Sequence, residues 1–186
     1  MNRKTFFKNF VHGGVWAALP GGWNIPVSFA QDGGDASSPS RDDRFLHRWI
    51  GSLLENFRKM KNPEEAVSLL ESCGRDCAKR GSIQMAHEAG ENVDNLLKAL
   101  ETHLGAGNAV RDGDRITLRY PECYCPLVSG MPPQKDSAWC DCSRGWLLEM
   151  FETVTGEAVQ VRLEQSILRG DPQCRFTIRI PPGSVP

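Results

Sequence analysis

Apolar residues recur at steps of three and four along the first part of the chain that follows residue 40. Between Asp42 and Lys59 they form one stripe, made of Phe45, Leu46, Trp49, Ile50, Leu53, Leu54 and Phe57. This period predicts an amphipathic helix. Asp42 and Asp43 would complement the exposed amides of its first turn.

Two further helices are predicted from their end signals. Asn62 followed by Pro63 is typical of a helix start, and Gly81 of its end. One face of this second helix would carry Ala66, Leu69, Leu70, Cys73 and Cys77. The third helix is expected over residues 93–104, with Leu96, Leu97 and Leu100 inside and Gly105 after its end.

The period then changes from helical to alternating. Asp112-Gly113 is a turn signal, and Ile116, Leu118 and Tyr120 alternate with polar residues, which predicts a hairpin. Residues 121–135 hold four prolines and are expected to form an irregular loop. Ser143 is expected to cap a fourth helix that ends at Gly156.

Two strands are expected to close the chain. The first contains Val159, Val161 and Leu163, and the second contains Cys174, Phe176, Ile178 and Ile180, with a turn at residues 170–172 between them. Three helices, a hairpin, a helix and a second hairpin predict an α+β fold, in which the N-terminal helices pack on a small antiparallel sheet.

The N-terminus is typical of an export signal. Arg3, Lys4 and Lys8 precede a weakly apolar run, and Ser28-Phe29-Ala30 offers small residues for cleavage. The start also resembles a twin-arginine signal in which Lys4 replaces the second arginine. We therefore expect a signal over residues 1–30, a flexible leader over 31–41, a single domain over 42–182 and a periplasmic location. An ordinary basic N-terminus is the alternative.

The charge of the chain argues against nucleic acid as a partner, and its hydropathy argues against a membrane-spanning helix. The chain has 22 basic and 23 acidic residues, so it lacks the general positive field that attracts nucleic acid. No run approaches the roughly 20 apolar residues that a membrane-spanning helix needs. The sequence leaves the oligomeric state open.

Seven cysteines are the most distinctive feature of the composition. Cys73 and Cys77 are four residues apart on a predicted helix, so their thiols share one face. The other five are Cys123, Cys125, Cys140, Cys142 and Cys174, and the first four form two Cys-x-Cys units beside the proline-rich loop.

Three interpretations of these cysteines stay open. They could be buried apolar residues, because free cysteine is among the most buried residue types. They could form disulfides between different units in an oxidising compartment. Thiolates from two or three units could also bind one metal ion, for which zinc is the first expectation. We favour the metal, and the sequence leaves the role of Cys73 and Cys77 undecided.

The C-terminal part resembles a known family. From Cys140 to Ile180 the chain reads CDCSRGWLLEMFETVTGEAVQVRLEQSILRGDPQCRFTIRI. A cysteine before an amphipathic helix, then a strand ending near glutamate and Gly-Asp-x-x-Cys-x-Phe, is similar to the C-terminal half of 4-vinyl-reductase-type domains. Proteins described as L-2-amino-thiazoline-4-carboxylate hydrolase-like share this ending. The resemblance implies a small-molecule-binding or sensor domain.

The same resemblance implies a set of zinc ligands. The family's first cysteine falls on Cys140 or Cys142, its glutamate on Glu164 and its last cysteine on Cys174. The middle ligand falls on Ile167, which cannot bind a metal, so Cys123 or Cys125 is expected to supply the missing thiolate. Cys140, Cys142 and Cys174 are therefore the leading candidates, with Cys123, Cys125 and Glu164 next.

A binding module is favoured over an enzyme. No nucleophile elbow, phosphate-binding glycine loop, zinc-protease motif or dinucleotide fingerprint occurs in the sequence. The ligand is expected to be apolar or aromatic and to contact aromatic residues near the cysteines, namely Tyr124, Trp139, Trp146 and Phe151. A cysteine-dependent hydrolase, using His87 or His103 and Asp141, is the alternative, and a thiol redox protein is the third.

Overall fold

The two predicted hairpins join into one antiparallel sheet. The computed structural model describes residues 40–182, and its strands are β1 Ala109–Asp112, β2 Arg115–Tyr120, β3 Gln160–Gln165 and β4 Cys174–Arg179. Their order in the sheet is β1-β2-β4-β3. The central pair sets Ile116 opposite Ile178 and Tyr120 opposite Cys174. The predicted α+β class is confirmed.

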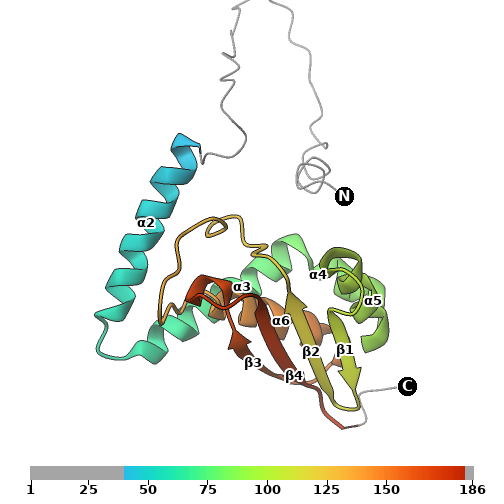
Figure 1. Cartoon of the computed structure of the whole chain (residues 1–186). Helices are drawn as coiled ribbons and strands as arrows, with labels where there is room; N and C mark the ends of the chain where they lie inside the picture. Colours follow the sequence, from blue (N-terminus) through green and yellow to red (C-terminus); the bar gives the residue numbers. More distant parts are fainter. Residues whose placement is uncertain (1–39, 183–186) are drawn as a thin grey trace, which may run out of the picture. The chain divides into compact units, whose positions relative to one another are not determined.

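Helices precede the sheet and also separate its two hairpins (Figure 1). They are α2 Arg41–Arg58, α3 Pro63–Gly81, α4 Ile83–Ala89, α5 Val93–Leu104 and α6 Asp141–Thr155, with a short 3-10 helix, η1, at Ile167–Arg169. The bounds of α2, α3 and α5 confirm the sequence predictions. Helix α4 was missed, because its seven residues are too few to show a clear apolar period.

Side chains cap three of these helices. Ser40 and Asp43 form a capping box at the start of α2. The side chain of Asn62 accepts a hydrogen bond from the backbone N–H of Glu64, as the sequence predicted, and Asn92 does the same for Asp94 at the start of α5.

The expected cap at Ser143 is wrong, because Cys140 occupies the N-cap position of α6. The backbone N–H groups of Asp141 and Cys142 donate to the carbonyl oxygens of Ala138 and Trp139 at 2.9 and 3.1 Å. The turn that precedes the helix therefore satisfies its first amides. As a result, the second Cys-x-Cys unit lies at the start of α6.

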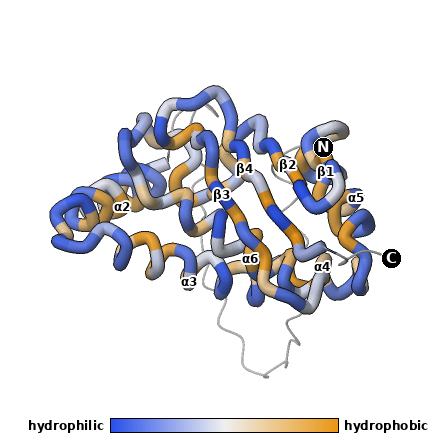
Figure 2. Tube along the Cα trace, turned by 90° about the horizontal axis from the view of Figure 1, so that it is seen from below, coloured by the Kyte–Doolittle hydropathy of each residue, from blue (hydrophilic) through white to orange (hydrophobic). Residues whose placement is uncertain are grey.

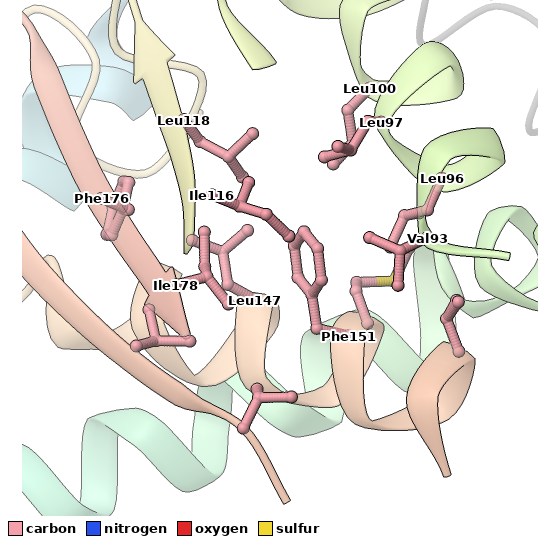
Figure 3. Packing of buried hydrophobic residues seen from close by; sticks show 14 of the residues in the cluster. Val93, Leu96, Leu97, Leu100, Ile116, Leu118, Leu147, Phe151, Phe176 and Ile178 are labelled. Carbon is pink, nitrogen blue, oxygen red and sulfur yellow. The ribbon is translucent and has the colours of Figure 1, made fainter. Parts of the chain in front are cut away.

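The main core fills the space between one face of the sheet and helices α5 and α6 (Figure 3). The two central strands contribute Ile116, Leu118, Phe176 and Ile178. These side chains face Leu147 and Phe151 of α6 and the leucines of α5. Phe151 and Phe176 are the largest side chains that are completely buried. The apolar residues that alternate along these strands, as the sequence predicted, therefore lie on the face of the sheet that packs on the helices.

Helices α3 and α6 touch backbone to backbone. A Cβ atom built at Gly74 of α3 would collide with the carbonyl oxygen of Cys142, and one at Gly145 of α6 would collide with that of Glu71. The buried residues of α3 are Ala66, Leu70, Gly74 and Ala78. The face predicted for this helix was therefore wrong in part, since Leu69, Cys73 and Cys77 are exposed.

Helix α2 packs on the rest of the fold through only part of its apolar stripe. Ile50 and Leu54 are buried, whereas Phe45 and Trp49 are 64% and 57% exposed. Bands of hydrophobic and hydrophilic residues alternate along α2 and α3 in Figure 2. The buried part belongs to a second apolar cluster, here named the α2 cluster, which consists of Ile50, Leu54, Leu70, Val128, Trp139, Cys140 and Leu168.

The predicted export signal over residues 1–30 and most of the predicted leader lie outside the described residues, so both stay predictions. In the described part of the chain, every helix is too short or too polar to cross a bilayer.

Candidate functional site

Cysteines from four separate parts of the fold approach one another. Cys73 and Cys77 lie on α3, Cys140 and Cys142 at the start of α6, and Cys174 at the start of β4. The loop that leaves β2 carries Cys123 and Cys125, and the pairing of Tyr120 with Cys174 brings the beginning of that loop beside β4. None of these described cysteines is joined to another in a disulfide.

Cys140 and Cys174 share a buried polar contact. The Sγ atom of Cys140 lies 3.0 Å from the Oγ atom of Ser166, which is completely buried. The backbone N–H of Ile167 donates to the Sγ atom of Cys174 over 3.4 Å. A hydrogen bond from Cys140 lowers the pKa of Cys174, and the same bond together with burial raises the pKa of Cys140. Cys174 is therefore the more readily ionised of the two.

Cys142 belongs to a different set of thiols. Its pKa is raised to about 12, first by burial and then by the nearby thiols of Cys125, Cys77, Cys73 and Cys140, because like charges repel. Cys125 and Cys142 also pack against the α2 cluster. The contact of Gly74 with Cys142 explains this proximity, since Cys73 adjoins Gly74 and Cys77 follows one turn later.

The cysteines thus fall into two neighbouring groups. The Cys174 group consists of Cys174, Cys140 and Cys123, the last of which acts electrostatically on Cys174. The Cys142 group consists of Cys142, Cys125, Cys73 and Cys77. Each Cys-x-Cys unit contributes one thiol to each group. The prediction that the sulfur atoms of these units lie close enough for a shared metal ion or a disulfide stays a prediction, and the sequence did not predict that Cys73 and Cys77 would act on Cys142.

Ion pairs hold the helices that carry the Cys142 group. Arg75 of α3 contacts Glu152 of α6 at 2.6 Å and Glu149 at 3.3 Å. Arg144 of α6 contacts Glu71 of α3 at 2.6 Å. All of these side chains are partly buried, where such pairs are screened less than at the surface. The network fixes the register of α3 against α6 and so the position of the α3 cysteines.

The expected zinc site does not form as the side chains stand. Among residues 40–182, no group of three or more His, Cys, Asp or Glu side chains could hold a metal ion. Cys140 and Cys174 are adjacent, but Cys142 gathers with the thiols of α3, and Glu164 is exposed on β3. The zinc ligand set of Cys140, Cys142, Cys174, Cys123, Cys125 and Glu164 therefore stays a prediction.

The residues of the alternative hydrolase are spread over three helices. His87 on α4 and His103 on α5 are both exposed. Asp141 at the start of α6 is nearly buried and pairs with Arg144 and Arg169, each at 3.4 Å. Burial raises its pKa, while the two arginines oppose that effect. These contacts tie Asp141 to the ends of α6 and η1.

Of the four aromatic residues expected near the site, one stands out. Phe151 is a core residue, Trp146 packs against the main core, and Tyr124 is 43% exposed beside Tyr120. Trp139 is 8% exposed within the α2 cluster, and its indole Nε1 has no hydrogen-bond partner among the described residues. A buried donor without an acceptor is uncommon and costly, and no sequence signal predicted it.

These features define a cysteine-rich α+β domain with a four-stranded antiparallel sheet and a cluster of thiols at the junction of α3, α6 and β4. Residues 34–184 match the model of a family of unknown function (DUF6144). The chain belongs to that family. None of the curated proteins matches the sequence.

The solved structures that are similar to this chain include two that contain ligands. One is the trafficking protein particle complex subunit 3 from Naegleria fowleri covalently bound to palmitic acid, at a TM-score of 0.51 and 16% identity, over 74% of this chain and 94% of that one. The other is the phenol-responsive sensory domain of the transcription activator PoxR with phenol, at a TM-score of 0.47 and 15% identity, over 72% and 73%. The first likeness supports the fold alone, and the second is too distant to add to it.

Proposed function

We propose that this protein is a small-molecule-binding module of the 4-vinyl-reductase type, and that its ligand inserts into the α2 cluster. The observation that carries the proposal is the indole N–H of Trp139, which is buried without an acceptor among the described residues. A ligand atom that accepts this hydrogen bond would remove the cost of burying it.

The setting of Trp139 indicates what the ligand looks like. Ile50, Leu54, Val128 and Leu168 surround it with aliphatic side chains. An apolar or aromatic molecule with one hydrogen-bond acceptor matches this environment. A structure with the same fold, the trafficking complex subunit from Naegleria fowleri, carries palmitic acid, which supports an apolar ligand here.

Helix α2, which supplies Ile50 and Leu54 to this cluster, has few buried residues. Within α2, the buried residues that contact the rest of the fold are Ile50 and Leu54. Elements with few buried apolar contacts open at a lower free energy than the global one. We propose that α2 shifts to admit the ligand while the core formed by α5, α6 and the sheet stays in place.

Replacement of Trp139 by phenylalanine tests the proposal. Palmitic acid and phenol serve as probes, and the readout is the rise in Tm that each causes in the full chain, since a ligand that binds the folded state stabilises it. We expect Trp139→Phe to reduce the ligand-induced rise in Tm. In the unliganded chain, removal of the unsatisfied donor should offset part of the cost of the smaller side chain.

Trp49→Phe is the matched control, because Trp49 is exposed on the same α2 helix whose buried face covers the cluster. It should leave the ligand-induced rise unchanged. A panel in which neither probe, nor any other apolar acid or phenol, raises the Tm of the wild type would overturn the proposal. Equal rises for the wild type and Trp139→Phe would overturn the assigned position.

The proposal includes export to the periplasm by the twin-arginine route, which the N-terminal sequence supports. A binding module and the alternative hydrolase predict different effects of changing the two histidines. For a binding module, His87→Ala and His103→Ala leave the affinity for the ligand unchanged. Turnover of an amide or thiazoline substrate that either substitution abolishes would favour the hydrolase instead.

A further inference from the structure

We propose that helix α2 docks on the surface of an anionic lipid membrane through Phe45, Trp49 and the arginines beside them. The helix lies in the plane of the membrane and does not cross it. This inference goes beyond the proposed function and does not rest on the ligand at Trp139. It concerns the exposed part of α2, whereas the ligand is assigned to the buried part.

Two aromatic side chains of α2 are largely exposed. Phe45 and Trp49 are 64% and 57% exposed. They are four residues apart, so they lie on the same side of the helix. They belong to the same apolar stripe as Ile50 and Leu54, which are buried. Helix α2 lies at the edge of the described fold in Figure 1. The outer part of its stripe therefore forms an exposed apolar surface of the kind that partners contact.

Basic side chains lie beside this aromatic pair. One hollow along the N-terminal half of α2 is lined by Arg41, Arg44, His47 and Arg48. The three arginines are exposed, and Arg41 and Arg48 form no ion pair with another residue of the described range 40–182. Arg41 precedes Phe45 by four residues and Arg48 follows it by three, so both adjoin its ring on the helix surface.

The acidic residues of α2 offset only part of this charge. Glu55 forms ion pairs with two basic residues at the end of the helix, at 3.4 and 3.6 Å, and Asp43 caps the helix through Ser40. Residues 41–61 hold six basic and three acidic residues, whereas residues 62–182 hold 13 basic and 18 acidic residues. The positive charge of the domain is therefore concentrated on the segment that carries the exposed aromatic pair.

An anionic membrane complements both features of this surface. Basic amphipathic helices that carry Trp or Phe lie in the membrane interface, where the rings enter the acyl boundary and the arginines contact the headgroups. The negative surface potential of such a membrane attracts basic residues that come within a Debye length of it. A second copy of the chain fits less well. A two-fold interface brings the same surface of each copy together, which would place the arginines of one copy towards those of the other.

Cosedimentation of the full chain with lipid vesicles tests the proposal. The vesicles consist of phosphatidylcholine alone or of an equal mixture with the anionic phosphatidylglycerol. We expect the wild type to sediment with the mixed vesicles and to stay in solution with phosphatidylcholine alone. Replacement of Arg41 and Arg48 together by glutamine should weaken binding to the mixed vesicles roughly 25-fold, at about fivefold for each arginine. Trp49→Ala should weaken it about tenfold, because less apolar surface enters the interface.

Two double variants serve as matched controls. Replacement of Arg115 and Arg162 by glutamine removes the same charge from exposed positions of the sheet. Replacement of Arg3 and Lys4 by glutamine removes it from the N-terminal sequence, outside the described residues. Both controls should bind the mixed vesicles as the wild type does. The α2 variants alter exposed side chains, so their Tm and far-ultraviolet circular dichroism should match those of the wild type.

The absence of binding to the mixed vesicles, or equal binding to both kinds of vesicle, would overturn the proposal. Wild-type binding by the α2 variants, or an equal loss in either control, would also overturn it. A wild-type dimer that Trp49→Ala converts into a monomer would assign this surface to a second copy instead. The rise in Tm with palmitic acid or phenol is measured without vesicles, so either proposal can fail without the other.

Discussion

The backbone N–H of Ile167 donates a hydrogen bond to the Sγ atom of Cys174 over 3.4 Å. Position 167 is where the 4-vinyl-reductase resemblance implies a metal-binding cysteine, yet the side chain here is aliphatic. In its place, the backbone stabilises the thiolate form of Cys174, whose pKa is lowered mainly by the hydrogen bond from Cys140. In this chain, Cys174 therefore accepts hydrogen bonds from the protein itself, from Cys140 and from the backbone of Ile167.

The close approach of α3 and α6 predicts the effect of one methyl group. Gly74→Ala should destabilise the protein by about 1–3 kcal/mol, because the new Cβ atom collides with a backbone carbonyl that cannot rotate away. Urea denaturation measures this loss.

Gly51→Ala provides the control for that measurement. Gly51 lies within α2, and a Cβ atom there meets nothing within 4 Å. Alanine at this site should stabilise the helix by roughly 0.5–1 kcal/mol through its higher helix propensity. A Gly74→Ala variant as stable as Gly51→Ala would show that the α3–α6 contact is looser than described.

The partly buried phenol of Tyr120 predicts a loss of stability at high pH. Burial raises its pKa above the ordinary value of 10.0, and Cys174 and Tyr124 add to the shift. Above pH 10, the unfolded chain releases this proton while the folded chain keeps it, so the free energy of unfolding falls as the pH rises. In the Tyr120→Phe variant, the free energy of unfolding should fall less steeply over this pH range.

Absorbance of tyrosinate checks the same point directly, because the chain contains two tyrosines. In Tyr124→Phe, the remaining tyrosine should stay protonated until the protein unfolds. Ionisation of Tyr120 near pH 10 in the folded variant would contradict the prediction. Both single variants keep the edge-on contact between the two rings, whose centroids are 5.7 Å apart, because phenylalanine retains the ring.

Export should shorten the chain at its N-terminus. We expect the intact mass of the periplasmic protein to correspond to a start near Gln31, after the small residues at 28–30. Replacement of Arg3 and Lys4 together by glutamine should block export, because the route recognises this basic pair. Protein that keeps Met1 and stays in the cytoplasm would contradict the predicted export signal.

Sequence reasoning predicted the elements better than their faces. End signals such as Asn62-Pro63 and Gly105 are local, so they located α3 and α5 closely. The face of α3 depends on what packs against it. Because Gly74 allows α6 to approach so closely, the buried stripe runs through Gly74 and Ala78 rather than through the more apolar Leu69.

The candidate site was predictable only in part for a similar reason. The Cys-x-Cys units show in the sequence that thiols gather near the loop. Their division between two groups depends on the turn at Ala138–Cys142, which starts α6 two residues before the expected cap. The unpartnered indole of Trp139 has no sequence signal, since it follows from the packing of residues far apart in the chain.

The pairing of β2 with β4 also has a consequence for how the protein forms. These strands lie at the centre of the sheet, but β2 ends at Tyr120 and β4 begins at Cys174. The intervening segment, α6 included, must be synthesised before the two strands can meet, and such distant pairings slow folding. Until β4 joins, the first hairpin has a bare edge that invites aggregation. The sheet is therefore completed only when β4 has been synthesised, and a chain that ends before β4 should fail to fold.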